Sequence, residues 1–284
     1  MPTSHTPLAF AVPLLSGLLG LAAYPGGVVA QTATPMTQKI AGIFDVEGHN
    51  LRINCIGTGS PTVVFEAGQG LQGAFMGTLQ RELAKQVLAC TYDRSIPIKP
   101  TLPTAADAVA DLHALLVVAA VPGPYVLVGH SLGGFFVQLY ARTYPDGVAG
   151  VVAINPVPPA RPWLERALPL MTEAEREGER AYYRGEEGDD PFDFYRSFAQ
   201  LDAAPPPPDI PFEMLISTSV QCESPDDICG RTYPVYQAVM KAVADEWPQG
   251  HFSELVAGHE TWDGAFEETI SVIQRVIDLA RSPE

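Results

Sequence analysis

The chain has 284 residues, 46% of them hydrophobic, which is enough for one large α/β domain. Its 33 acidic residues outnumber its 17 lysines and arginines, so the formal net charge is −16 at pH 7. Because the sequence contains no basic patch, nucleic acid and anionic membrane surfaces are excluded as expected partners.

Residues 1–30 differ from the rest of the chain because they contain no Asp, Glu, Lys or Arg. A mostly apolar run from Leu8 to Ala23 precedes Pro25-Gly26-Gly27 and small residues up to Ala30. This pattern is typical of a secretory signal peptide cleaved after Ala30, although no basic residue precedes the apolar run. We therefore expect a secreted or periplasmic protein. A disordered apolar leader or a membrane anchor are the alternatives, but the run is short for a spanning helix.

Four cysteines follow this leader: Cys55, Cys90, Cys222 and Cys229. An even number in an exported chain suggests two disulfides, and three pairings are open. Buried thiols in a cytosolic protein are the alternative. No Cys-x-x-Cys pair and no His/Cys cluster has the spacing of metal ligands.

Strands and helices alternate along most of the sequence. Strands are predicted at 43–46, 51–56, 62–66, 87–92, 125–128, 148–154, 212–218 and 252–256, the first two as a hairpin. Helices are predicted at 75–86, 105–120, 135–142 and 269–279. This order predicts a mostly parallel eight-stranded sheet with helices on both faces. Ligands of such sheets bind at the carboxyl ends of the strands.

Residues 156–211 interrupt the alternation. They contain several prolines, an acidic helical segment at 172–184 and aromatic residues at 192–198. We interpret them as a helical cap inserted between two core segments, 31–155 and 212–284, with a proline run as a stiff return to the core. A disordered loop is the alternative.

A serine between two glycines stands where the fifth predicted strand meets a helix, in Gly129-His130-Ser131-Leu132-Gly133. In a nucleophile elbow the turn is too tight for side chains beside the serine, and it lifts the hydroxyl clear of the sheet. The Gly-x-Ser-x-Gly pattern alone is a weak signal, but the strand and the helix around it are the context that it requires. We therefore predict that Ser131 is a nucleophile.

A serine hydroxyl needs a neighbouring base to attack at neutral pH. His259 is favoured among the six histidines because it follows the last predicted strand, in the chain order serine, acid, histidine. The acid should follow the seventh strand, where the loop offers Glu223, Asp226 and Asp227. The sequence does not choose among the three, and we favour Asp226 or Glu223.

An oxyanion hole needs two backbone N–H donors. Leu132, the residue after the nucleophile, should supply one of them. Gln69 should supply the other, because Gly68-Gln69-Gly70 follows the third strand and its glycines allow a close approach. An ordinary glycine turn is the alternative for this loop.

Three motifs carry a resemblance to the α/β-hydrolase superfamily: Glu66-Ala67-Gly68, Tyr92-Asp93-Arg94 and Gly129-His130-Ser131-Leu132-Gly133-Gly134. They look like a bacterial group of exported hydrolases, over residues 40–156 and Gly258-His259. The resemblance implies the α/β-hydrolase fold with its second and fourth strands adjacent. It therefore favours the disulfides Cys55–Cys90 and Cys222–Cys229, the second of which would pin the loop of candidate acids.

The chain departs from this group at two places. Residues 95–100 replace a glycine-rich loop, and Asn155 stands where an aspartate is usual, which moves the search for the acid to the seventh-strand loop. Asp93 and Arg94 are interpreted as a structural anchor at the strand end, since the reaction already has its three roles filled.

The sequence therefore predicts an exported serine hydrolase that cleaves a small-molecule carboxylic ester or a related acyl bond, with no metal or organic cofactor and no stable membrane association. Aromatic residues of the cap suggest a substrate with an apolar or aromatic part. A proline-type aminopeptidase, a lactonase, a carbon–carbon bond hydrolase or an acyltransferase are alternatives on the same residues. A ligand-binding protein without turnover is a third possibility, against which the intact Ser131 and His259 argue.

Overall fold

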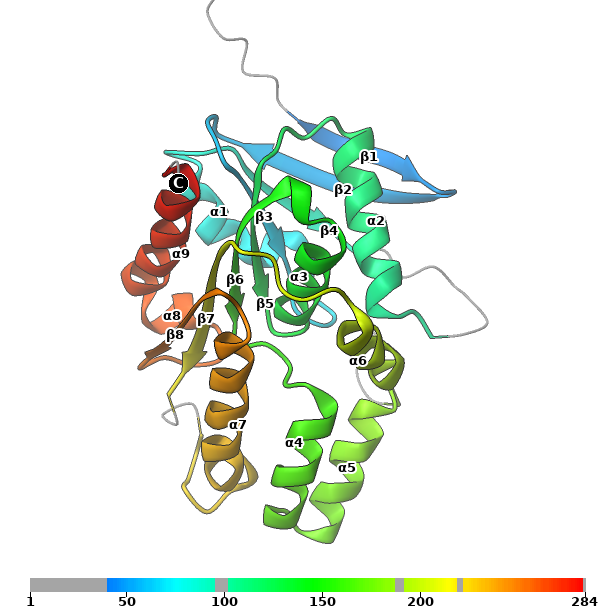
Figure 1. Cartoon of the computed structure of the whole chain (residues 1–284), viewed down its shortest axis with the longest axis vertical. Coiled ribbons are helices and arrows are strands. Elements are labelled where there is room, and N and C mark those ends of the chain that lie inside the picture. Colours follow the sequence, from blue (N-terminus) through cyan, green and yellow to red (C-terminus); the bar gives the residue numbers. More distant parts are fainter. Residues whose placement is uncertain (1–39, 95–101, 187–191, 219–221, 283–284) are drawn as a thin grey trace, which may run out of the picture. The chain divides into compact units, whose positions relative to one another are not determined.

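The computed structural model describes residues 40–282 except for 95–101, 187–191 and 219–221. The leader predicted for residues 1–30 lies outside the described residues. Eight strands form one sheet in the order β1-β2-β4-β3-β5-β6-β7-β8 (Figure 1). Their bounds are β1 Ala41–Val46, β2 His49–Ile56, β3 Thr62–Glu66, β4 Ala89–Asp93, β5 Tyr125–His130, β6 Val148–Ile154, β7 Pro211–Ser217 and β8 Gln249–Leu255.

The strand directions confirm the predicted sheet. β1 and β2 form an antiparallel hairpin, and β2 also pairs antiparallel with β4. From β4 through β3, β5, β6, β7 and β8 every pair is parallel. Each predicted strand is present, with ends that differ by a few residues.

The helices lie in two layers that cover the two faces of the sheet. α1 (Gly77–Leu83) and α9 (Phe266–Arg281) pack in one apolar cluster, whereas α2 (Ala105–Val118) and α3 (Leu132–Thr143) pack in the other. Successive residues of β5 alternate between them, since Val126 and Val128 belong to the first cluster and Leu127 to the second. Burial on both faces explains why the central strands are mostly apolar. Short 3₁₀ turns at Gly73–Met76 (η1) and Pro145–Gly147 (η2) precede α1 and β6.

The segment between β6 and β7 is helical. It contains α4 (Ala160–Ala167), the 3₁₀ turn η3 (Leu168–Leu170), α5 (Glu173–Tyr183) and α6 (Phe194–Ala203). Its aromatic rings pack on α3, with ring centroids 4.3 Å apart for Phe135 and Phe198 and 5.1 Å apart for Phe136 and Phe192.

Neither α7 (Ile228–Asp245) nor the single turn α8 (Thr261–Gly264) was predicted from the sequence. Pro234 lies inside α7, and a proline in a helix interior is unfavourable because it lacks an N–H and its ring clashes with the preceding turn. Asp227 caps the start of α7 by accepting a hydrogen bond from the Gly230 N–H at 2.7 Å. The helix therefore forms from this cap and from its buried face, where Val239 and Met240 join the core.

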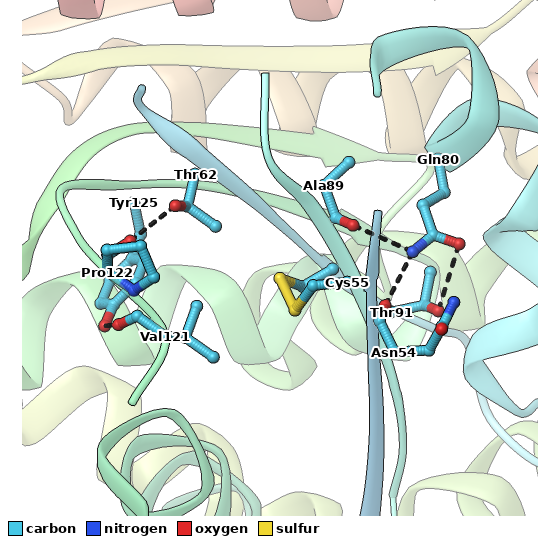
Figure 2. Close-up of a disulfide and its surroundings, with 10 residues drawn as sticks. Asn54, Cys55, Thr62, Gln80, Ala89, Thr91, Val121, Pro122 and Tyr125 are labelled. Atoms are coloured by element: carbon cyan, nitrogen blue, oxygen red, sulfur yellow. Dashed lines mark hydrogen bonds between the residues drawn. A yellow bond between two sulfur atoms is a disulfide. The ribbon is translucent and has the colours of Figure 1, made fainter. Parts of the chain in front are cut away.

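Both predicted disulfides are present, Cys55–Cys90 and Cys222–Cys229. Cys55 and Cys90 are register partners on β2 and β4, as the adjacency of these strands implies. Figure 2 shows this region, where the Gln80 amide donates to the carbonyl oxygens of Asn54 (2.7 Å) and Ala89 (3.0 Å). A disulfide and a buried side-chain amide thus join the same pair of strands.

Across the described ranges, no helix has both the length and the apolar character needed to cross a bilayer.

Candidate active site

Ser131 lies on a sharp turn between β5 and α3. Its backbone angles are φ 53° and ψ −120°, in the left-handed half of the map that a residue with a side chain rarely adopts. The Ser131 N–H donates to Ile154 O at 2.9 Å, and its carbonyl oxygen accepts from Gly134 N–H at 3.0 Å. The neighbouring backbone thereby holds the strained conformation that a nucleophile elbow requires.

The glycines on either side of Ser131 are there for steric reasons. A Cβ on Gly129 would lie 2.3 Å from Gly133 O, and a Cβ on Gly133 would lie 2.2 Å from Glu66 O. Both distances are far below van der Waals contact with backbone atoms that cannot move aside. Both positions therefore require glycine for steric reasons, as expected from the sequence.

Ser131 and His259 line the same pocket, which has a volume of about 420 Å³. His259 lies in the loop between β8 and α8 and is solvent-exposed. Its ring packs against the His130 ring, with centroids 4.6 Å apart. No hydrogen bond joins Ser131 to His259 in the described part of the chain. Such contacts are often loose without substrate and tighten in the reacting complex.

The electrostatics of His259 favour the neutral imidazole. Although His259 is exposed overall, neighbouring residues shield its ring from part of the solvent and lower its pKa below the usual 6.5, and the Glu260 carboxylate opposes this by raising it. A neutral ring at pH 7 can accept a proton. His259 is therefore in the protonation state that a general base needs.

Two side chains hold the backbone beside His259, and we call them the Asn155–Ser217 clamp. Asn155 Nδ2 donates to His259 O and to Ser217 Oγ, both at 2.7 Å, while Asn155 Oδ1 accepts from Ser217 N–H at 2.7 Å. Ser217 Oγ also donates to Gly258 O. Asn155 directly follows β6 and has a positive φ of 42°, and Ser217 ends β7. The clamp thus ties the ends of two strands to the His259 loop.

The clamp gives Asn155 a role that was not predicted from the sequence. An amide can donate to a carbonyl oxygen, whereas an ionised carboxylate only accepts hydrogen bonds. Asparagine at the end of β6 therefore serves the backbone of His259 rather than its ring.

His130 is a buried neutral residue. Burial, together with the nearby His259, lowers the pKa of His130 to about 3. Its Nε2–H donates to His259 O at 3.2 Å, and its Nδ1 is buried without a hydrogen-bond partner in the described structure. The ring packs against Trp262, with centroids 4.9 Å apart. His130 therefore supports the His259 loop.

The loop after β3 lies directly against Ser131. A Cβ added to Gly68 would be 3.3 Å from Ser131 Cβ, and Gln69 is the next residue of this loop. The Leu132 N–H begins α3, and within the described residues it donates to no protein acceptor. The structure therefore places both candidate oxyanion donors, Leu132 and the loop of Gln69, beside Ser131.

The structure does not bring the three candidate acids to the ring of His259. Glu223 and Asp226 are exposed. Asp227 accepts from the Gly230 and Ser224 N–H groups at 2.7 and 2.8 Å, and these bonds lower its pKa. Over the described ranges, no hydrogen bond joins any of the three carboxylates to His259. Their loop nevertheless borders the pocket, because Cys229 lines it.

One group of metal-ligand types occurs in the described residues, formed by Cys222, Asp227 and Cys229. The disulfide occupies both sulfur atoms, and Asp227 binds backbone N–H groups. Thiolate is the form of cysteine that binds metals, so this group does not fit a metal ion.

The wall of the pocket is largely aromatic, and the sequence analysis did not assign these residues to the site. They come from α4, α5 and α7: Trp163, Glu179, Tyr182, Tyr183, Thr232, Tyr233 and Tyr236. Trp163 Nε1–H donates to Glu179. Aromatic residues of the cap were expected to face the substrate. The contribution of α7 to the pocket could not be expected, because that helix was not predicted.

Residues 57–272 match the sequence model of the family described as "Alpha/beta hydrolase family".

Two curated relatives resemble shorter stretches of the chain. A pimeloyl-[acyl-carrier protein] methyl ester esterase of Chromobacterium violaceum is 36% identical over 113 residues, 38% of this chain and 42% of that protein. A putative carbamate hydrolase, RutD, of Cronobacter sakazakii is 31% identical over 102 residues, 34% of this chain and 38% of that protein. The chain thus spans about two fifths of the length of these relatives.

Solved structures match most of the chain at low identity. A thermophilic esterase from Thermogutta terrifontis superposes with a TM-score of 0.57 and 19% identity, covering 86% of this chain and 100% of that chain. An epoxide hydrolase from Vigna radiata gives a TM-score of 0.59 and 12% identity, covering 86% of this chain and 99% of that chain. These likenesses concern the fold, and they agree with the predicted one.

Proposed function

The chain belongs to the alpha/beta hydrolase family, and from this premise we propose that it is a serine hydrolase that cleaves carboxylic esters or related acyl bonds. The observation that carries the proposal is a strained serine elbow in one pocket with a neutral histidine and beside two sources of backbone N–H donors. These are the parts that acyl transfer needs.

In the proposed mechanism Ser131 Oγ attacks the substrate carbonyl carbon while His259 takes the hydroxyl proton. The carbonyl oxygen becomes an oxyanion, which the N–H groups of Leu132 and Gln69 stabilise. Each such donor contributes about 3 kcal/mol to the transition state. His259 then gives the proton to the leaving alcohol, and water activated by His259 releases the acyl group from Ser131.

For the acid that orients His259, we propose Glu223 or Asp226. Asp227 is the weaker candidate because its carboxylate caps α7. Glu260 is added as a fourth, since its charge acts on His259. Single carboxylate-to-amide variants test the four residues. The substitution that removes the orienting acid should lower kcat by about 10⁴-fold. If all four keep wild-type kcat, no carboxylate of this set orients the ring.

For the substrate, we propose an ester with an apolar or aromatic part that lies against the tyrosines of α5 and α7. The helices of residues 156–211 would then act as a cap over Ser131. A volume of about 420 Å³ is at the small end of the range of ligand pockets. A series of p-nitrophenyl esters of rising acyl length should therefore show an optimum at short or aromatic acyl groups.

Glu179 favours a second candidate, a peptidase that holds a substrate amine. Of the four glutamates of α5 at 173, 175, 177 and 179, only Glu179 lines the pocket. A carboxylate among aromatic faces suits a cationic group. Comparing amino-acyl p-nitroanilides with p-nitrophenyl esters separates the two, and a Glu179→Gln variant should lose activity on the amines alone. Assays with lactones, with substrates of carbon–carbon bond hydrolases and with added acyl acceptors test the remaining alternatives, a lactonase, a carbon–carbon bond hydrolase and an acyltransferase.

We further propose that the protein is exported and that residues 1–30 are its signal peptide. The two disulfides support this, because disulfides persist mainly in oxidising compartments. Sequencing of the mature protein should then find Gln31 at its N-terminus.

A fluorophosphonate probe tests the central proposal. It should label the wild-type chain at Ser131 and leave Ser131→Ala unlabelled, and the variant should have no ester turnover. Alanine removes only the hydroxyl, so the circular dichroism spectrum should be unchanged. A folded wild-type protein that takes no label would instead favour a ligand-binding protein without turnover.

A further inference from the structure

A buried ion pair lies directly behind the loop that carries Gln69. Glu66 ends β3 and Arg94 follows β4, and their side chains are 2% and 6% exposed. Arg94 Nη1 donates to Glu66 Oε1 at 2.6 Å. Tyr92 O–H donates to the other carboxylate oxygen of Glu66, and burial together with the Glu66 charge raises the pKa of Tyr92, which keeps this donor protonated.

The same guanidinium binds the backbone of the loop. Arg94 Nη1 also donates to Ala67 O at 3.1 Å, and Arg94 Nη2 donates to Gly68 O at 2.8 Å. The ring of Phe136 lies under the guanidinium, 5.3 Å from centroid to Cζ. Planar, multidentate binding of this kind is specific to arginine.

The contact between Arg94 and Gly68 O also determines how the next N–H group is oriented. Gly68 C=O and Gln69 N–H belong to one trans peptide unit, which is planar, so that the N–H points opposite to the C=O. Because Arg94 holds Gly68 O from one side, the Gln69 N–H must point to the other. Gly68 is also the residue at which this loop contacts Ser131, so the peptide unit held by Arg94 lies next to Ser131.

We propose that Arg94 is a positioning residue, which, with Glu66, fixes the direction of the Gln69 N–H toward the oxyanion. This inference rests on the proposed function of Ser131. A buried ion pair adds little to stability compared with apolar residues of the same volume, and holding a catalytic backbone donor in place gives a specific reason to keep one here. It assigns Arg94 a part in catalysis beyond the structural anchor predicted from the sequence.

The test uses paired substitutions. Arg94→Gln alone leaves the Glu66 charge buried without its guanidinium and risks misfolding, so the main variant is Glu66→Gln with Arg94→Gln. The matched control is Arg142→Gln with Glu246→Gln. Arg142 is 9% exposed, pairs with Glu246 at 3.2 Å and stacks on Trp247, and the pair lines no part of the Ser131 pocket.

In the main variant kcat for a p-nitrophenyl ester should fall by about 10²- to 10³-fold, the loss expected for one oxyanion donor, with KM within about twofold. Affinity for a trifluoromethyl ketone, whose adduct with serine carries an oxyanion, should fall by the same factor. The control should keep both values. Arg94→Lys should recover only part of kcat, since an ammonium cannot reproduce the planar fork.

Two outcomes would overturn the inference: a folded main variant with kcat within fivefold of wild type, or a fall in kcat with unchanged affinity for the ketone. The fluorophosphonate probe separates these from a failure of the proposed function. If the wild-type chain is not labelled at Ser131, the function itself is wrong, and the positioning role is wrong with it.

Discussion

An Asn155→Ala substitution removes every hydrogen bond by which this amide holds Ser217 and His259. Three bonds of 2.7 Å are lost, and each contributes a net of about 1 kcal/mol. Alanine tolerates the positive φ of 42° less well than asparagine, which adds about 1 kcal/mol. The free energy of unfolding should therefore fall by about 4 kcal/mol.

Urea denaturation followed by tryptophan fluorescence measures this loss. At a urea concentration where the variant is still folded, its kcat should be about 10²-fold lower than that of the wild type. Without the clamp the His259 loop can shift, and a displacement of about 1 Å is enough to misalign the proposed base. Asn50→Ala is the control, since Asn50 is exposed in the β1–β2 hairpin and should change stability by less than about 0.5 kcal/mol. A loss below about 1 kcal/mol with unchanged kcat would refute the clamp.

Three further predictions concern protons and the disulfide. Because the pKa of His259 is lowered, activity should be lost as pH falls through a midpoint below 6.5 in kcat/KM, and Glu260→Gln should move it lower still. His130 stays neutral down to about pH 3 in the folded protein but becomes charged near pH 6.5 in the unfolded chain. The free energy of unfolding should therefore decrease as the pH is lowered. From pH 7.5 to 4.5 this histidine accounts for about 3 kcal/mol, a loss that should be absent in His130→Gln. Replacing Cys55 and Cys90 by serine should cost about 4 kcal/mol in a denaturation curve, since their bridge closes a loop with a sequence separation of 35. An equal pH dependence in His130→Gln, or a midpoint above 6.5, would count against the reasoning.

The parallel strands and the elbow could be predicted because local sequence determines them. Short apolar runs bounded by turn residues favour buried strands, because helices are usually longer. The elbow at Ser131 combines two sterically required glycines with a strand and a helix. The pairing of Cys55 with Cys90 was predicted from the family resemblance, which implies that β2 and β4 are adjacent, and the structure shows them paired.

Other features depend on contacts between distant segments. α7 was missed because Pro234 interrupts its pattern, while its stability comes from the Asp227 cap and from packing. The acid could not be chosen, because three carboxylates within five residues of one loop give no directional signal. Asn155 was noticed only as a departure, since its partners at 217 and 259 meet it through the sheet.

The order of the pocket residues along the chain has a practical consequence for protein engineering. The proposed nucleophile and backbone donors lie at or before residue 132 and the proposed base is at 259, whereas the described aromatic wall comes from α4, α5 and α7, at positions 163 to 236. Libraries confined to these three helices can alter which molecule is accepted while leaving the reactive centre intact. Selection for new substrates should begin there.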